Sequence, residues 1–199
     1  TRPRTLTPGM RILYLHQYYC PAGGRGNDRS RAFAAAWAAQ GHEVTVLTST
    51  AAFPQEHPAQ RRWRYVFMEH GVRIVALRAP YRQEMSYARR SLAFLQFFFI
   101  ALFEALRLPR IAVVYASSTP PTIGWVALLL KFFRGTPFVF ETVDVWPDTP
   151  IGMGVIRSRW LGALLHAAVN RIYRAAAAIV VLSEGMRAQV QACLRITQR

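Results

Sequence analysis

Short apolar runs alternate with longer segments of helical periodicity along this chain. The apolar runs predict buried strands at 11–16, 43–48, 111–115, 138–141 and 178–182. The longer segments predict helices at 31–40, 91–108, 120–133 and 157–174. Because parallel strands joined by helices cross over right-handedly, this order predicts an α/β fold. We expect a Rossmann-like doubly wound parallel sheet with helices on both faces.

A hairpin is predicted between two additional strands. Residues 65–69 and 72–77 flank His70-Gly71, a dipeptide suited to a tight turn. The segment 51–62 contains two prolines and is predicted to be a loop. A short helix is expected to open at Ser183.

The loop between the first strand and the first helix combines glycine with arginine. Glycine lets the backbone approach a ligand closely, and guanidinium groups make bidentate contacts with phosphate or carboxylate. Sheets of this type bind ligands at the carboxyl ends of their strands, where this loop lies. The alternative interpretation is an ordinary turn with solvated arginines and a structural histidine. The candidate phosphate- or acceptor-binding residues are His16, Gly23, Gly24, Arg25, Gly26, Asn27 and Arg29.

A dinucleotide site is the weaker interpretation of the same loop. The glycine spacing is not G-x-G-x-x-G, and Thr48-Ser49-Thr50 at the end of the second strand lacks the acid that binds a ribose hydroxyl. Asp28 or Ser30 is expected to cap the helix that follows the loop.

One acidic residue ends the strand at 138–141, and another lies in the turn that follows it. Glu141 and Asp144 are the candidate catalytic residues, because carboxylates here can position or deprotonate an acceptor hydroxyl. Asp148 is equally well explained as a turn-capping residue. Ser118 and Thr119 are expected to cap the helix at 120–133, with ligand contact as a secondary role.

Composition narrows the possible partners. The 199 residues are 52% hydrophobic and carry a formal charge of +15, with Lys131 as the only lysine. This favours one folded domain that meets anionic ligands or membranes. No recognised readout motif is visible, so nucleic acid is the minority interpretation. Cys20 and Cys193 lack the spacing of a zinc site, and no metal or other cofactor is expected.

The segment at 91–108 is apolar nearly all round but shorter than the roughly 20 apolar residues of a membrane span. We expect one face to be buried in the core, and membrane contact by another face is an open alternative. The candidate lipid-contacting residues are Arg82, Arg89, Arg90, Phe94 and Phe98.

Several motifs occur in the order found in a known family. They are Met10 to Tyr19, Gly23 to Asn27, Gly41 to Thr48, Ala116 to Pro120, Phe140-Glu141 with Asp144 to Pro147, and Val181 to Ser183. With these motifs the chain resembles the amino-terminal domain of family 4 retaining glycosyltransferases of the GT-B fold. The branch it is most similar to comprises bacterial polysaccharide enzymes that transfer N-acetylated amino sugars.

The resemblance implies an acceptor-binding domain at 10–191, preceded by an extension or cloning remnant at 1–9. A donor domain would follow the tail at 192–199, so this chain alone is expected to be inactive. The implied donor is a nucleotide sugar, with UDP expected, and the implied acceptor is a lipid-linked glycan. The enzyme would act in the cytoplasm, peripherally at the inner face of the cell membrane.

One position departs from the family pattern, and one alternative function stays open. Family members tend to have a basic residue or histidine before the aspartate, whereas this chain has Val143. Asp144 itself matches. The alternative is a non-catalytic module on a Rossmann-like scaffold that binds membranes or polyanions.

Overall fold

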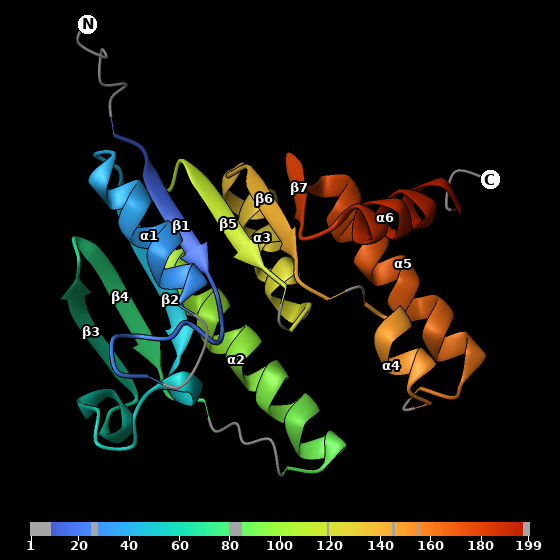
Figure 1. Ribbon diagram of the computed structural model, residues 1–199, viewed down its shortest axis with the longest axis horizontal. Coiled ribbons are helices and arrows are strands. Elements are labelled where there is room, and N and C mark those ends of the chain that lie inside the picture. The colour runs from blue at the N-terminus through green and yellow to red at the C-terminus, as the bar shows by residue number, and fades with distance from the viewer. Residues whose placement is uncertain are drawn as a thin grey trace, which may run out of the picture.

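The computed structural model describes residues 9–24, 28–79, 85–118, 120–144, 146–154 and 156–196. At its centre is a seven-stranded sheet with the order β3-β4-β2-β1-β5-β6-β7 (Figure 1). The strands are β1 (Arg11–Leu15), β2 (Glu43–Ser49), β3 (Arg64–Glu69), β4 (Val72–Leu77), β5 (Val113–Ser117), β6 (Phe138–Thr142) and β7 (Ala178–Val181).

Six α-helices accompany the sheet in the described part of the chain. They are α1 (Arg29–Ala39), α2 (Tyr87–Arg107), α3 (Thr122–Arg134), α4 (Asp148–Gly152), α5 (Arg159–Ala175) and α6 (Glu184–Ile196). Two short 3-10 turns, Thr50–Ala52 and Pro58–Arg61, occupy the segment predicted as a loop. None of the described helices is long and apolar enough to cross a membrane.

All strand pairs are parallel except β3 with β4. These two form the predicted hairpin, and its turn places His70 at φ 49° and Gly71 at φ 77°. The left-handed backbone at both positions matches the right-handed twist of the strands. The predicted α/β doubly wound sheet is therefore confirmed, with one antiparallel edge strand.

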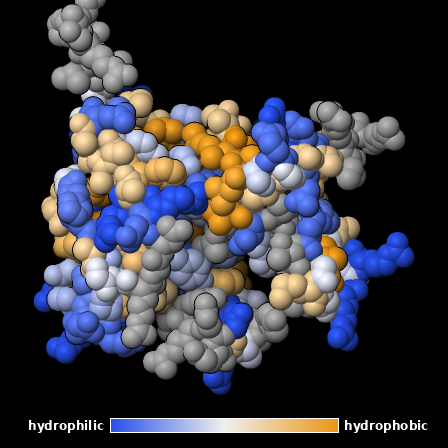
Figure 2. Space-filling view, in the orientation of Figure 1, coloured by the Kyte–Doolittle hydropathy of each residue, from blue (hydrophilic) through white to orange (hydrophobic). Residues whose placement is uncertain are grey.

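Successive side chains of each strand point to opposite faces of the sheet, so the core has two parts, one on each face. Tyr14 points to the face covered by α1, where it packs against Trp37. Leu13 and Leu15 point to the opposite face, in the core that includes buried residues of α2, α3 and α5. Figure 2 shows an apolar band over β5 to β7 between α1 and α6, and Val180 on β7 is 37% exposed.

An ion pair ties α2 to the far edge of the sheet. Arg64 on β3 places Nη2 2.6 Å from Oε1 of Glu104, whose side chain is 9% exposed. Glu104 interrupts the apolar sequence of α2 because it faces this arginine. The pair thus fixes α2 across the back of the sheet.

Several predicted boundaries were wrong. β5 begins and ends two residues later than predicted, at Val113–Ser117, and α4 was not predicted. Neither Asp28 nor Ser30 caps α1 through its side chain, although Asp28 holds the N-cap position. Ser118 does not cap α3, which has Pro121 at its N-cap. Thr119 lies outside the described residues.

Packing between α3, β6 and α5 requires glycine at position 124. A Cβ there would lie 2.7 Å from Cε2 of Phe140 and 2.8 Å from Cδ1 of Ile172. We predict that Gly124→Val lowers the free energy of unfolding by about 2–3 kcal/mol, because both neighbours are buried. Urea denaturation measures this, with Gly152→Val as control because that glycine faces open space. Equal stability of the two variants would contradict the packing argument.

Candidate functional site

The parallel register aligns polar side chains at the carboxyl edge of the sheet. Leu15 pairs with Ala116, so His16 follows in line with Ser117, and Ser117 pairs with Glu141. These positions continue the face that carries Tyr14 and Tyr115, which is the face covered by α1. The strands β1, β5 and β6 end at the same edge of the sheet (Figure 1), and by their register these polar residues form one row there.

An ion pair joins this row to α1. Arg29, the first residue of α1, places Nη1 2.9 Å from Oε1 of Glu141. The Glu141 side chain is 1% exposed and that of Arg29 is 31% exposed. The guanidinium also lies 5.7 Å from the ring centroid of Phe33. A buried carboxylate therefore fixes a half-exposed cation at the start of α1.

Aromatic rings form the floor beneath the row. Tyr14 stacks on His16 with the ring centroids 5.8 Å apart, and it meets Tyr115 edge to face at 5.3 Å. Burial, followed by the charge of Glu141, raises the pKa of both tyrosines above the ordinary value. Both phenols consequently stay protonated at neutral pH.

His16 is a neutral imidazole at neutral pH. Burial, assisted by the positive charge of Arg29, lowers the pKa of His16 from 6.5 to about 4. A neutral imidazole accepts a hydrogen bond at one nitrogen and donates at the other. His16 is thus suited to a hydroxyl group of a ligand.

The loop after β1 is anchored by two sets of hydrogen bonds. The carbonyl of Gln17 accepts from the Ser49 hydroxyl at 2.7 Å and from the Thr48 hydroxyl at 3.1 Å. The Glu69 carboxylate accepts from the Tyr19 hydroxyl at 2.9 Å and from the amide of Ala22 at 2.7 Å. Residues 17–22 are therefore held against the ends of β2 and β3.

Two positions in this loop require glycine, one for its backbone conformation and one for lack of space. Gly23 has φ 75°, where other residues are strained. A Cβ at Gly24 would lie 2.9 Å from the Ala52 carbonyl oxygen and 2.9 Å from Sγ of Cys20. The backbone does approach another group closely at Gly24, but that group is the protein's own backbone at Ala52 and not a ligand. Arg25, Gly26 and Asn27 lie outside the described residues.

Four side chains around the row have buried polar atoms without a hydrogen-bond partner in the described part of the chain. They are Nδ1 of His16, both amide atoms of Gln17, Oγ of Ser30 and Oγ of Ser117. An unsatisfied buried polar atom costs about 1–3 kcal/mol. An ordered water, or a polar ligand that reaches this edge, would satisfy these donors and acceptors.

The turn after β6 carries the second candidate carboxylate. Ser118, buried at the end of β5, accepts a hydrogen bond at Oγ from the amide of Val143 at 3.0 Å. This bond, in place of the predicted helix cap, fixes the turn in which Asp144 lies exposed. Of the two candidate acids, Asp144 is thus open to solvent and Glu141 is enclosed.

The predicted lipid-contacting residues lie on or near α2. Phe94 and Phe98 are half-buried, Arg89 is exposed and Arg90 donates to the carbonyl of Met85 at 3.0 Å. Arg82 lies outside the described residues.

Sequence reasoning missed several residues of the site. Ser117 and Tyr115 belong to the row, and placing the end of β5 two residues later would have included Ser117. Gln17 lies in the loop after the first strand, but the candidates there were His16 and the glycine- and arginine-rich residues that follow it. Glu69 gave no local signal, because its partners Tyr19 and Ala22 are distant in sequence.

Loss of the Arg29 cation should destabilise the fold. We predict that Arg29→Met lowers the free energy of unfolding by about 2–3 kcal/mol, since it leaves the buried Glu141 carboxylate uncompensated. The double variant Arg29→Met with Glu141→Gln should recover part of the loss. In urea denaturation, Arg31→Met is the control, because its partner Asp28 is 68% exposed and such pairs contribute about 1 kcal/mol or less. Equal effects of the two arginine variants would refute the buried pair.

The buried His16 should make stability depend on pH. Between its unfolded pKa of 6.5 and its folded pKa of about 4, the unfolded chain binds a proton that the native chain does not. The free energy of unfolding should therefore fall as the pH drops through this range, by at most about 3.4 kcal/mol for this group. Urea denaturation at pH 7, 5.5 and 4.5 should show a flatter profile for His16→Asn than for the parent. Parallel profiles would show that His16 is not buried as a neutral group.

Comparison with known proteins relates this architecture to a family. Residues 26–198 match the family described as glycosyl transferase 4-like domain. No curated protein sequence gives a significant match. Sucrose-phosphate synthase from Thermosynechococcus elongatus superposes with a TM-score of 0.63 at 15% sequence identity, covering 91% of this chain and 44% of that chain. The C-terminal domain of the PF1911 hydrogenase from Pyrococcus furiosus gives a TM-score of 0.46 at 17% identity, covering 69% of this chain and 95% of that domain. That second likeness is too weak to bear on the fold.

The chain spans less than half the length of the synthase chain that it resembles. The predicted fold class, one half of a GT-B fold, is confirmed. Because the family match covers most of the sequence, this chain belongs to the glycosyl transferase 4-like domain family.

Proposed function

We propose that this domain is the acceptor side of a retaining glycosyltransferase. The enzyme would move an N-acetylated amino sugar or a hexose from a nucleotide sugar, with UDP expected, to a lipid-linked glycan. In this proposal a separate donor domain binds the nucleotide sugar. The observation that carries the proposal is the polar row at the carboxyl edge, with Arg29 fixed on Glu141.

The row suits a phosphorylated sugar. Arg29 supplies positive charge to a phosphate, and α1 adds the positive end of its dipole at the same place. The neutral His16 and the Ser117 hydroxyl offer hydrogen bonds to sugar hydroxyls. Glu141 then serves as a positioning residue for Arg29, and Asp144 is the exposed carboxylate available to an acceptor hydroxyl.

An exposed apolar stripe on α2 supports an acceptor held in a membrane. Leu92, Leu95, Phe99 and Phe103 recur at spacings of three and four residues and are 66%, 49%, 63% and 56% exposed. Arg107 lies 3.8 Å from the ring centroid of Phe103, which places a cation beside the stripe. Such a face suits the interface of an anionic bilayer. These four residues replace Phe94 and Phe98 as the main proposed lipid contacts.

The net charge favours the same location. A formal charge of +15 attracts the protein to anionic lipids, as expected for a peripheral enzyme at the inner face of the membrane. A bacterial enzyme of surface polysaccharide synthesis would meet its lipid-linked substrate there. The same charge and stripe also fit the alternative, a membrane-binding module without catalysis. The test must therefore distinguish binding to the glycan from binding to the lipid surface.

Vesicle flotation makes this separation. Three vesicles are compared at 0.15 M salt, made of phosphatidylcholine, of phosphatidylcholine with phosphatidylglycerol, and of the latter with a polyprenyl-pyrophosphate disaccharide. We predict that the anionic lipid increases binding and that the glycolipid increases it further. Ser117→Ala should reduce only the glycolipid increment, by about 2- to 10-fold, because it removes one hydrogen bond.

The double variant Phe99→Ser with Phe103→Ser should weaken binding to all anionic vesicles at least about tenfold, since two phenylalanines no longer bury their rings. Met68→Ser is the matched control, because Met68 is 65% exposed on the edge strand β3. Equal binding to anionic vesicles with and without the glycolipid would favour the module without catalysis. Absence of binding to any vesicle would refute the membrane location.

A further inference from the structure

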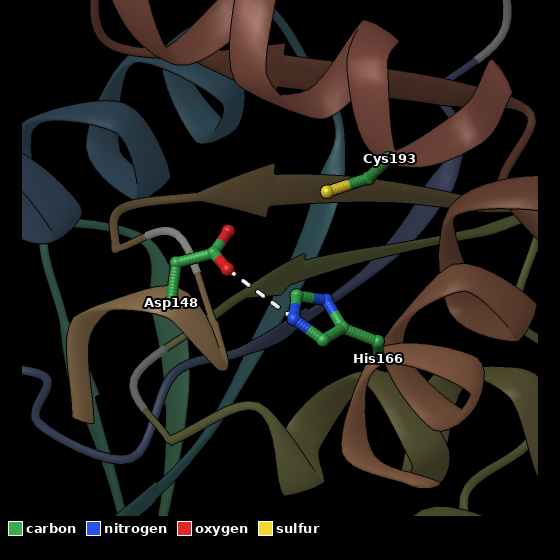
Figure 3. Close-up of side chains that lie close together, drawn as sticks. All are labelled: Asp148, His166 and Cys193. Atoms are coloured by element: carbon green, nitrogen blue, oxygen red, sulfur yellow. Dashed lines mark ion pairs between the residues drawn. The ribbon is translucent and has the colours of Figure 1, made fainter. Parts of the chain in front are cut away.

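Three side chains from three successive helices converge beyond the carboxyl edge of the sheet. Figure 3 shows Asp148 of α4, His166 of α5 and Cys193 of α6 pointing toward one another. One donor atom of each, a carboxylate oxygen, an imidazole nitrogen and a thiol sulfur, lies within 4.8 Å of the other two. None of these side chains takes part in the polar row described above.

The distances are close to those of a shared metal ion. Nε2 of His166 lies 3.3 Å from Oδ1 of Asp148. Two ligands at about 2.0–2.1 Å from a tetrahedral ion are separated by about 3.3–3.4 Å. A sulfur at about 2.3 Å from the ion would lie about 3.6 Å from either of them. Because Cys193 Sγ lies within 4.8 Å of both, each of these distances has to shorten by about 1.2 Å at most. Rotation of exposed or half-buried side chains allows such a movement.

The donor set is selective as well. Thiolate with imidazole favours zinc over magnesium or calcium, which prefer oxygen ligands. Three protein ligands leave a fourth position for water or another ligand. We propose that Asp148, His166 and Cys193 bind one zinc ion. This goes beyond the proposed transfer of sugar and does not depend on it.

The packing of α6 indicates what the ion would do. Among the side chains of α6 that the structure describes, only Val190 is fully buried. Helix α6 contacts α5 and β7, and Cys193 lies near its carboxyl end. A zinc ion would join that end of α6 to both α4 and α5. The zinc ion would therefore act as a structural crosslink that holds α6, a helix with few buried side chains.

Access to the site is open from solvent. The side chain of Asp148 is 47% exposed and that of His166 is 36% exposed. An ion can thus enter without unfolding the domain. The proposed site differs from the expectation of no metal, because its three ligands come from separate helices and have no spacing that is recognisable in the sequence.

Metal titration of the reduced, metal-free chain tests the proposal. We expect one zinc ion per chain by competition with a chromophoric chelator, and a rise in the melting temperature with zinc. Cobalt(II) in place of zinc should give the near-ultraviolet absorption of a thiolate ligand. Cys193→Ser should abolish that absorption and weaken zinc binding at least tenfold.

Two further variants separate ligation from folding. His166→Gln should weaken binding at least tenfold while cobalt keeps its thiolate absorption, because Cys193 is intact. Cys20→Ser is the matched control, since this second thiol is buried beside Pro21 and away from the cluster, and it should change neither readout. Circular dichroism verifies that each variant is folded. Unchanged zinc affinity in folded Cys193→Ser, or cobalt binding without thiolate absorption in the parent, would overturn the proposal.

Discussion

The ion pair between Arg29 and Glu141 is the contact on which the candidate site depends. Glu141 is enclosed at the end of β6, and a carboxylate in that environment requires a compensating cation. Arg29 supplies it from the first residue of α1, so the start of that helix is fixed to the middle of the sheet edge. The glycine loop before α1 is held at its other end by Gln17 and Glu69. The described residues on both sides of the loop are therefore fixed to the edge of the sheet.

The polar row follows from the parallel sheet beneath it. Parallel strands end at the same edge, and their register puts His16, Ser117 and Glu141 side by side. Tyr14 and Tyr115 fill the space below with aromatic rings. Burial and the positive charge of Arg29 keep His16 neutral. A half-exposed guanidinium next to neutral hydrogen-bonding groups is an arrangement suited to a phosphorylated sugar. The alternation of side chains along each strand and the register between strands thus place the proposed acceptor site at this edge of the sheet.

Local patterns were sufficient for the fold but only for part of the site. Apolar runs identified the strands, and the His70-Gly71 turn identified the hairpin, because each depends on neighbouring residues. Contacts between residues that are far apart in the sequence could not be predicted from local patterns. Glu69 anchors a loop nearly fifty positions earlier in the chain, and Ser118 binds the amide of Val143 instead of its own helix.

Nuclear magnetic resonance titration of the chain with a soluble glycan pyrophosphate tests the central claim most directly. The claim is that the row formed by His16, Ser117 and Arg29 binds the acceptor. The account predicts that the side-chain signals of His16 and Arg29 shift in proportion to occupancy, and that Ser117→Ala weakens the apparent affinity. Shifts confined to other regions, or saturable binding that leaves these two signals unchanged, would contradict it.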